Sequence, residues 1–273
     1  MTNIGVFDSG VGGLWILKHL KAELPGYNYV FFGDQAHVPY GKRGMQEIKS
    51  FSEEITKFLI SRDCKVIVIA CNAASAASLK YLRGKFPEVI FVGMEPAIKK
   101  AVEVTDTKKV GVLATPATFQ GELYNSIVER FAHDVSIFKD TCEGLVGQIE
   151  KGDLDGKGTR EILEKALKPM IEKNIDTVVL GCTHYPFVIP MIKEIVGSSV
   201  NVIDPTGAIV RQVTRVLDEN KLQSESREKS NTQIFTSGKT EDMEPILLKL
   251  FDGDIVEIDG KKYAVKVWEN IRV

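Results

Sequence analysis

Long apolar runs and a strong excess of either charge are both absent from this sequence. A helix that crosses a bilayer needs about 20 consecutive apolar residues, and the first residues lack the basic and apolar stretches of a signal peptide. The formal net charge of -2 gives no electrostatic reason for nucleic acid or an anionic membrane to be the main partner. We therefore expect a cytoplasmic protein that binds neither.

Cysteine is scarce: the chain has four, and no two of them form a C-x-x-C pair. Their spacing suits neither a zinc site nor a dense disulfide framework, so we expect no bound metal. In a cytosolic protein such cysteines are either buried small side chains or reactive thiols. Cys64 precedes a predicted strand and Cys142 follows another, and we interpret both as structural.

Short β-branched runs alternate with helical stretches along the whole chain, a pattern typical of an α/β fold with mostly parallel strands. The predicted strands are residues 4–7, 29–32, 66–70, 89–92, 110–113, 135–138, 178–180 and 200–203. The predicted helices are residues 12–24, 45–62, 121–132, 159–173 and 187–196, and the polar residues 221–233 are predicted as a surface loop.

The two halves of the chain resemble each other. A strand that ends near Asp8 has its counterpart in a strand that ends near Thr115, and two further strands deliver Cys71 and Cys182 at their carboxyl ends. The counterparts lie roughly 110 residues apart, which suggests a duplication. We predict two pseudo-symmetric α/β lobes that face each other, with the active site in the cleft between them.

Small or reactive residues follow several predicted strands, at the edge where open α/β sheets bind their ligands. Helix N-termini at this edge favour carboxylates, so we expect a small anionic ligand. The glycines of residues 8–13 lack the spacing of a dinucleotide loop and the lysine of a phosphate loop. A phosphate site is therefore the weaker alternative.

Cys71 and Cys182 each precede a side chain that can form hydrogen bonds, Asn72 or Thr183. A thiol at a helix N-terminus has a lowered pKa, and we expect both cysteines to be partly ionised; buried packing residues are the alternative. His184 is a candidate for moving protons to and from Cys182, because no other histidine has a metal-ligand spacing with it.

Asp8 and Glu150 are the acidic candidates for the same site. Asp8 lies at the end of a predicted strand, among the residues expected at the site. Nothing in the local sequence around Glu150 places it near those strand ends. Taken alone, Glu150 is predicted to be a solvated helix residue.

Six motifs carry a family resemblance: G5-V-F-D-S-G-V-G-G-L14, G33-D-x-A-x-x-P-Y-G41, A70-C-N-x-A-S75, G93-x-E-P96, L180-G-C-T-H-Y-P186 and T236-S-G238. Together they resemble the glutamate racemases of the aspartate/glutamate racemase superfamily. The resemblance implies two α/β lobes, the first from residues 1–96 with 207–273 and the second from residues 97–206. It also implies cofactor-independent interconversion of L- and D-glutamate, which supplies D-glutamate for peptidoglycan synthesis, and a homodimer.

The resemblance also assigns roles to individual residues. Cys71 and Cys182 would be the two acid/base thiols, with Asp8 assisting the first and Glu150 and His184 assisting the second. The positions expected to contact the glutamate substrate are Asp8, Ser9, Pro39, Tyr40, Gly41, Cys71, Asn72, Ala73, Thr118, Cys182, Thr183 and His184.

The chain departs from the family motifs at three positions. Ala73, Gln35 and Trp15 each stand where threonine is usual, and the segment 141–150 matches only loosely. Ala73 removes a hydroxyl expected to bind substrate, and one lost hydrogen bond to a charged group costs about 1.5–3 kcal/mol. Two alternatives therefore stay open: an aspartate or broad-specificity racemase, and an amino-acid-binding homologue with impaired turnover.

Overall fold

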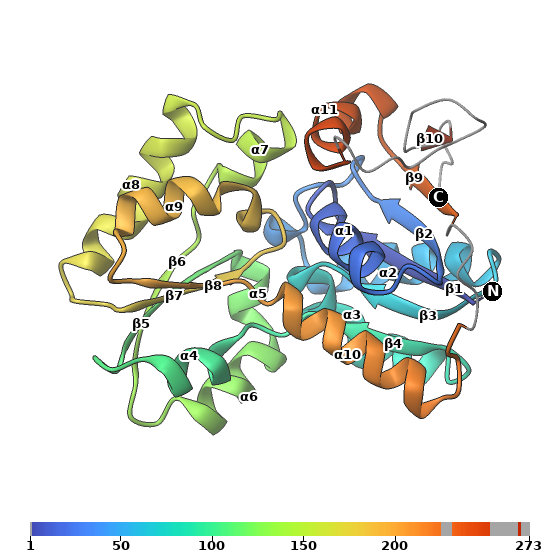
Figure 1. Ribbon diagram of the computed structural model, residues 1–273, viewed down its shortest axis with the longest axis horizontal. Coiled ribbons are helices and arrows are strands. Elements are labelled where there is room, and N and C mark those ends of the chain that lie inside the picture. Colours follow the sequence, from blue (N-terminus) through green and yellow to red (C-terminus); the bar gives the residue numbers. More distant parts are fainter. Residues whose placement is uncertain (1, 225–230, 252–266, 269–273) are drawn as a thin grey trace.

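The computed structural model describes residues 2–224, 231–251 and 267–268. They form two lobes that lie side by side, each built on a parallel β-sheet with helices packed against it (Figure 1). The α/β fold class and the two-lobed arrangement predicted from the sequence are confirmed.

The first lobe contains a six-stranded sheet of order β10-β9-β2-β1-β3-β4. Its elements are β1 (Asn3–Asp8), α1 (Gly13–Glu23), β2 (Asn28–Gly33), the 3-10 helix η1 (Tyr40–Lys42), α2 (Met45–Ile60), β3 (Cys64–Ile69), α3 (Asn72–Lys85), β4 (Ile90–Gly93), α10 (Thr206–Glu219), β9 (Thr232–Thr236), α11 (Thr240–Phe251) and β10 (Val267–Trp268). The late helix α10 packs on α1 and β4, so the chain returns to this lobe after building the other.

The second lobe contains a four-stranded sheet of order β6-β5-β7-β8. Its elements are α4 (Ile98–Val104), β5 (Lys109–Ala114), α5 (Pro116–Gln120), α6 (Glu122–Phe131), β6 (Ser136–Asp140), α7 (Leu145–Glu150), α8 (Lys157–Ile171), β7 (Thr177–Gly181), the 3-10 helix η2 (Tyr185–Val188), α9 (Ile189–Val196) and β8 (Asn201–Ile203).

The strand order reveals the relation between the lobes. The run β2-β1-β3-β4 in the first sheet has the same order as β6-β5-β7-β8 in the second. Strand β3 thus corresponds to β7, and these are the strands that precede Cys71 and Cys182. The domain boundaries near residues 97 and 207 stay a prediction, and residues 252–266 and 269–273 of the first predicted lobe lie outside the described residues.

The two lobes share a packed contact. A continuous cluster of buried apolar side chains extends from Leu17 of α1 to Leu180 of β7. Trp15 of α1 adds to this contact: its ring centroid lies 5.6 Å from that of Phe187, and its Nε1 donates a hydrogen bond of 3.0 Å to Asp204. The lobes are therefore held at a defined orientation on the side of α1.

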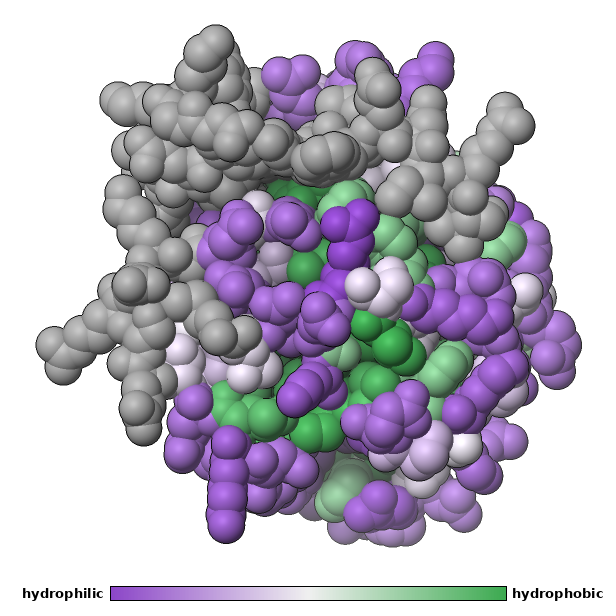
Figure 2. All heavy atoms as spheres, turned by 90° about the vertical axis from the view of Figure 1, so that its right-hand side faces the viewer, coloured by the Kyte–Doolittle hydropathy of each residue, from purple (hydrophilic) through white to green (hydrophobic). Residues whose placement is uncertain are grey.

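The outer face of the first lobe, which points away from the second, is largely hydrophilic with some hydrophobic side chains near its centre (Figure 2). Among the described helices, none is long and apolar enough to span a membrane. The predicted loop 221–233 is wrong at its end: Thr232 and Gln233 belong to β9, which pairs with β2. Residues 225–230 of that loop lie outside the described residues.

Candidate active site

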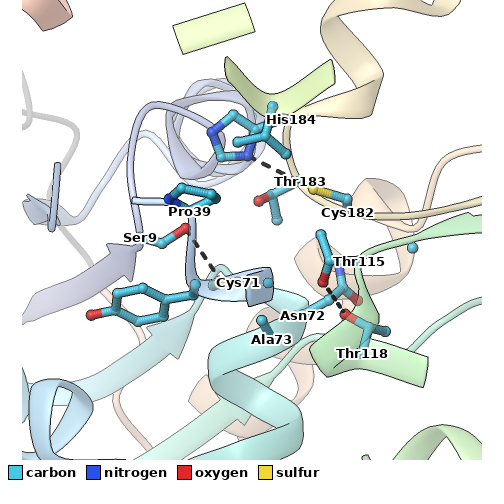
Figure 3. Close-up of a pocket in the computed structure, with 14 residues that line it drawn as sticks. Ser9, Pro39, Cys71, Asn72, Ala73, Thr115, Thr118, Cys182, Thr183 and His184 are labelled. Carbon is cyan, nitrogen blue, oxygen red and sulfur yellow. Dashed lines mark hydrogen bonds between the residues drawn. The ribbon is translucent and has the colours of Figure 1, made fainter. Parts of the chain in front are cut away.

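The carboxyl ends of β1, β3 and β7 meet at a cavity between the lobes (Figure 3). Every predicted substrate-binding residue except Asp8 lines it. The lining residues are Ser9, Pro39, Tyr40, Gly41, Cys71, Asn72, Ala73, Thr115, Thr118, Val146, Gly181, Cys182, Thr183 and His184. Thr115, which ends a predicted strand, lies among the strand ends expected at the cleft. The sequence analysis gave no binding role to Val146 or Gly181; Gly181 lies in the motif L180-G-C-T-H-Y-P186, whereas Val146 carries no signal of its own.

The cavity is narrow. Its free volume is about 10 Å³, which is room for about one water molecule. An amino acid can therefore enter only when the lobes or the lining side chains move apart.

Cys71 is the N-cap of α3 and lies at the floor of the cavity. The backbone N–H of Ala74 donates to its sulfur at 3.4 Å, and its thiol points at the Oγ of Ser9 at 3.8 Å. Burial raises the pKa of the Cys71 thiol well above its usual range, and the neighbouring Asp8 raises it further. The lowered pKa expected for Cys71 is wrong, because loss of water outweighs the donor at the helix N-terminus.

Asp8 lies directly behind this thiol and is fully buried. Its Oδ1 accepts hydrogen bonds from the Ser9 backbone N–H at 2.7 Å and from the Ser9 hydroxyl at 3.4 Å. Burial raises the pKa of the Asp8 carboxyl, and the positive charge of His184 only partly opposes this. Cys71, Ser9 and Asp8 thus form a hydrogen-bonded chain from thiol to carboxyl group.

Glycine is required in the loop that follows Asp8. A Cβ on Gly12 would lie 2.6 Å from Oγ1 of Thr183 and 2.7 Å from Oδ2 of Asp8. Thr183 comes from the second lobe and donates a hydrogen bond of 3.2 Å to that same Asp8 oxygen. The glycine therefore allows the two lobes to approach closely enough for this bond.

Cys182 follows β7 and faces the cavity from the second lobe. Its sulfur lies 3.8 Å from Nδ1 of His184, and Nε2 of His184 is hydrogen-bonded to Oε1 of Glu150. Burial disfavours a charged imidazole, but the bonds to Cys182 and Glu150 outweigh it and raise the pKa of His184 well above 6.5. Cys182, His184 and Glu150 form a second chain from thiol to carboxylate.

Glu150 is drawn inward rather than solvated. Its side chain is 12% exposed, and Oε1 also accepts a hydrogen bond from the backbone N–H of Val11 at 2.9 Å. Burial raises the pKa of the carboxyl, but the bonds from His184 and Val11 outweigh burial and lower it below 4.5. The prediction of a solvated residue is wrong, because α7 turns this residue towards the other lobe.

Asn72 and Ala73 form the first turn of α3 beside the cavity. The side chain of Asn72 is buried, and neither its Oδ1 nor its Nδ2 has a hydrogen-bond partner among the described residues. A buried amide without partners is costly, so this amide is available to a polar ligand. Ala73 lines the same wall with a methyl group alone.

The two cysteines interpreted as structural lie outside the cavity. Cys64 begins β3 at the end of the strand away from the site, and Cys142 is buried beside β6. All four cysteines fall within the described residues and are free. Within that same part of the chain, no three of its His, Cys, Asp and Glu side chains are grouped to hold a metal ion.

Comparison with known proteins identifies the family. A profile described as Asp/Glu/hydantoin racemase matches residues 16–213. A glutamate racemase of Pseudomonas paraeruginosa is 44% identical over 244 residues, which cover 89% of this chain and 92% of that one. The chain belongs to the Asp/Glu/hydantoin racemase family.

Solved structures of this family superimpose on the whole molecule. A glutamate racemase isoform of Bacillus anthracis matches with a TM-score of 0.85 at 28% identity, covering 98% of this chain and 97% of that chain. The glutamate racemase of Francisella tularensis, solved in complex with D-glutamate, matches with a TM-score of 0.82 at 28% identity, covering 99% and 97%. The resemblance expected from the motifs is confirmed, and the chain is an isomerase of this family.

Proposed function

We propose that this racemase interconverts L- and D-glutamate with Cys71 and Cys182 as its two acid/base groups. One observation carries the proposal. Two thiols at corresponding strand ends line a single cavity, and each is linked to its own carboxyl group, through Ser9 on one side and His184 on the other. Inversion at Cα needs a base on one face and an acid on the other, and this arrangement offers both.

The reaction requires one thiolate and one thiol at the start of each turnover. For one enantiomer, Cys182 as thiolate removes the α-proton while the Cys71 thiol donates a proton to the opposite face. For the other enantiomer the roles reverse, so Cys71 must first lose its proton and Cys182 must gain one, which its neighbour His184 can deliver. Ser9 and Asp8 provide the route for the proton of Cys71, since the hydroxyl accepts from the thiol and donates to Asp8.

The intermediate carries negative charge on the substrate's α-carbon and carboxylate. Helix α3 presents its N-terminus to the cavity, and backbone N–H groups and the helix dipole stabilise negative charge there. The unpaired amide of Asn72 can donate to a carboxylate oxygen at the same end. Together these groups lower the cost of removing the weakly acidic α-proton.

Ala73 supports a second candidate, a racemase of broader specificity that also accepts aspartate. The missing hydroxyl removes one fixed donor from the wall that would hold a substrate carboxylate. A non-catalytic binding protein is less well supported, because both thiols retain their partner groups. The wider role that we propose, supply of D-glutamate for peptidoglycan synthesis by a cytoplasmic homodimer, follows the family resemblance.

The decisive experiment measures inversion and Cα–H exchange together in deuterated water, with L- and D-glutamate and both aspartates. We expect both glutamate enantiomers to convert. Cys71→Ser and Cys182→Ser should each abolish inversion, because a serine hydroxyl is too weak an acid to take the thiol's place. Cys64→Ser, outside the cavity, is the matched control and should retain most of the activity. Inversion that persists in either of the first two variants would show that another group is the base.

A further inference from the structure

Gln35 follows β2 at a position where the family motif usually has threonine, and its side chain connects the two lobes. Its Oε1 accepts a hydrogen bond of 3.0 Å from the hydroxyl of Thr236 at the end of β9. Its Nε2 donates a hydrogen bond of 3.2 Å to Oε2 of Glu150 in the second lobe. A threonine hydroxyl lies one bond from Cβ and cannot span this distance.

A chain of hydrogen bonds fixes the orientation of the Gln35 amide. The backbone N–H of Gly238 donates to Oγ1 of Thr236 at 3.0 Å, so the Thr236 hydroxyl proton is free to point at Gln35. The amide oxygen of Gln35 accepts it, and the amide nitrogen must then face Glu150. The donor is thus aimed at the carboxylate by groups that belong to the first lobe.

Both carboxylate oxygens of Glu150 therefore accept hydrogen bonds. Oε1 is bonded by His184 and by the backbone N–H of Val11, whereas the side chain of Gln35 donates to Oε2. Without it, Oε2 would face an open groove lined by Lys151, Glu241 and Asp242. The carboxylate could then turn towards water and towards Lys151, and away from His184.

We propose that Gln35 is a positioning residue, which holds the Glu150 carboxylate aimed at His184 and thereby sets the rate of proton transfer at Cys182. The inference deepens the proposed two-thiol function and depends on it. Gln35 makes no hydrogen bond to Ser9 or Asp8 of the Cys71 chain, so we expect it to act mainly on the proton transfer at Cys182; the charge of His184 also reaches Asp8, but only through space. This selectivity separates positioning from a general structural role.

Isotope effects on glutamate deuterated at Cα distinguish the two proton transfers. The isotope effect on kcat/KM for one enantiomer reports abstraction by Cys182, and that for the other reports abstraction by Cys71. Slowing only the Cys182 transfer makes that step more rate-limiting. The first isotope effect must then rise while the second falls, even though kcat/KM itself drops equally for both enantiomers, which have equal free energies.

The variant to test is Gln35→Met, which keeps the length of the side chain and removes the amide. We expect kcat/KM to fall roughly tenfold, the equivalent of about 1.4 kcal/mol for one hydrogen bond to a charged group, with the isotope effects moving in opposite directions. Glu150→Gln should change each isotope effect in the same direction as Gln35→Met changes it. Gln35→Thr introduces the residue of the family motif and is the second variant in case Gln35→Met fails to fold. It should lower kcat/KM and change the isotope effects in the same directions.

The control is Gln223→Met, which removes another amide-to-carboxylate bond, 2.9 Å from Gln223 to Asp218 on the surface. It should leave the rate and both isotope effects unchanged. Unchanged isotope effects in the Gln35 variants, or a parallel change for both enantiomers, would overturn the proposal. Absence of glutamate inversion in the wild-type protein would instead refute the proposed function, so the two failures are distinguishable.

Discussion

Replacing Glu150 by glutamine removes the charge from the carboxylate that partners His184 and keeps the size of the side chain. The amide oxygen of the new residue can still accept from the Val11 backbone N–H, which now donates at 2.9 Å. His184, however, would face a neutral group while only 2% exposed. Since burial disfavours the imidazolium, we expect the pKa of His184 to fall when the opposing charge is removed.

The burial of Glu150 and His184 determines how much unfolding free energy the substitution should cost. Breaking a buried ion pair by removing one partner costs about 3–5 kcal/mol. Glu150 is 12% exposed and the amide keeps a hydrogen bond, so we expect a loss at the lower end, about 3 kcal/mol of unfolding free energy. Proton transfer at Cys182 should slow as well, because a neutral imidazole no longer assists the thiolate.

The pH dependence gives the sharper test. The pKa of His184 is raised in the folded protein. Its contribution to the stability of the fold is therefore complete below pH 6.5 and is lost as the pH rises through the raised value. The pKa of Glu150 is lowered, so the stabilisation is present above pH 4.5 and is lost as the pH falls through the lowered value. The difference in unfolding free energy between wild type and Glu150→Gln should therefore be largest between these limits.

Two measurements check this expectation: urea unfolding across the pH range, and NMR titration of the imidazole signals. The chain has four histidines, so the His184 signal can be assigned by substitution. A stability difference that does not vary with pH would refute the reasoning, as would a wild-type His184 that titrates at the ordinary value of 6.5.

Two further substitutions test the departures from the family motifs. Ala73→Thr restores the missing hydroxyl on the cavity wall and should improve kcat/KM for glutamate roughly tenfold, the equivalent of about 1.4 kcal/mol; parallel assays with aspartate check specificity, and an unchanged glutamate rate would show that Ala73 causes no defect. Trp15→Phe keeps the aromatic contact with Phe187 but removes the 3.0 Å bond to Asp204, so urea unfolding should show a loss of about 1.5 kcal/mol; a change within about 0.5 kcal/mol would mean that this bond does not stabilise the lobe contact.

Strong periodicity made parts of the fold predictable. The helix expected at residues 45–62 is α2, Met45–Ile60, and each predicted strand overlaps an observed one. Helix α3 was not predicted, because its sequence is rich in alanine and serine and has few large apolar residues to show a period. Strand β9 was not predicted either. One reason is that its first residues, Thr232 and Gln233, are polar and gain their order from pairing with β2.

The candidate site was predictable wherever a residue ends a strand. Cys71 and Cys182 stand out because the two halves repeat the same pattern around them. Glu150 and Gln35 do not stand out, because their roles depend on a contact between the lobes. These two residues lie 115 residues apart in sequence. No local pattern encodes such a contact, and no pattern of spacing conveys that burial raises the pKa of Cys71.

The narrow cavity has a consequence for the timing of the chemistry. Donors cross between the lobes in both directions: Val11 and Gln35 of the first lobe reach Glu150, and Thr183 of the second reaches Asp8. Each separation of the lobes to exchange an amino acid would take a donor from both carboxyl groups at once. We therefore expect these hydrogen bonds to form again at each closure, so that both carboxyl groups regain their donors before the α-proton is removed.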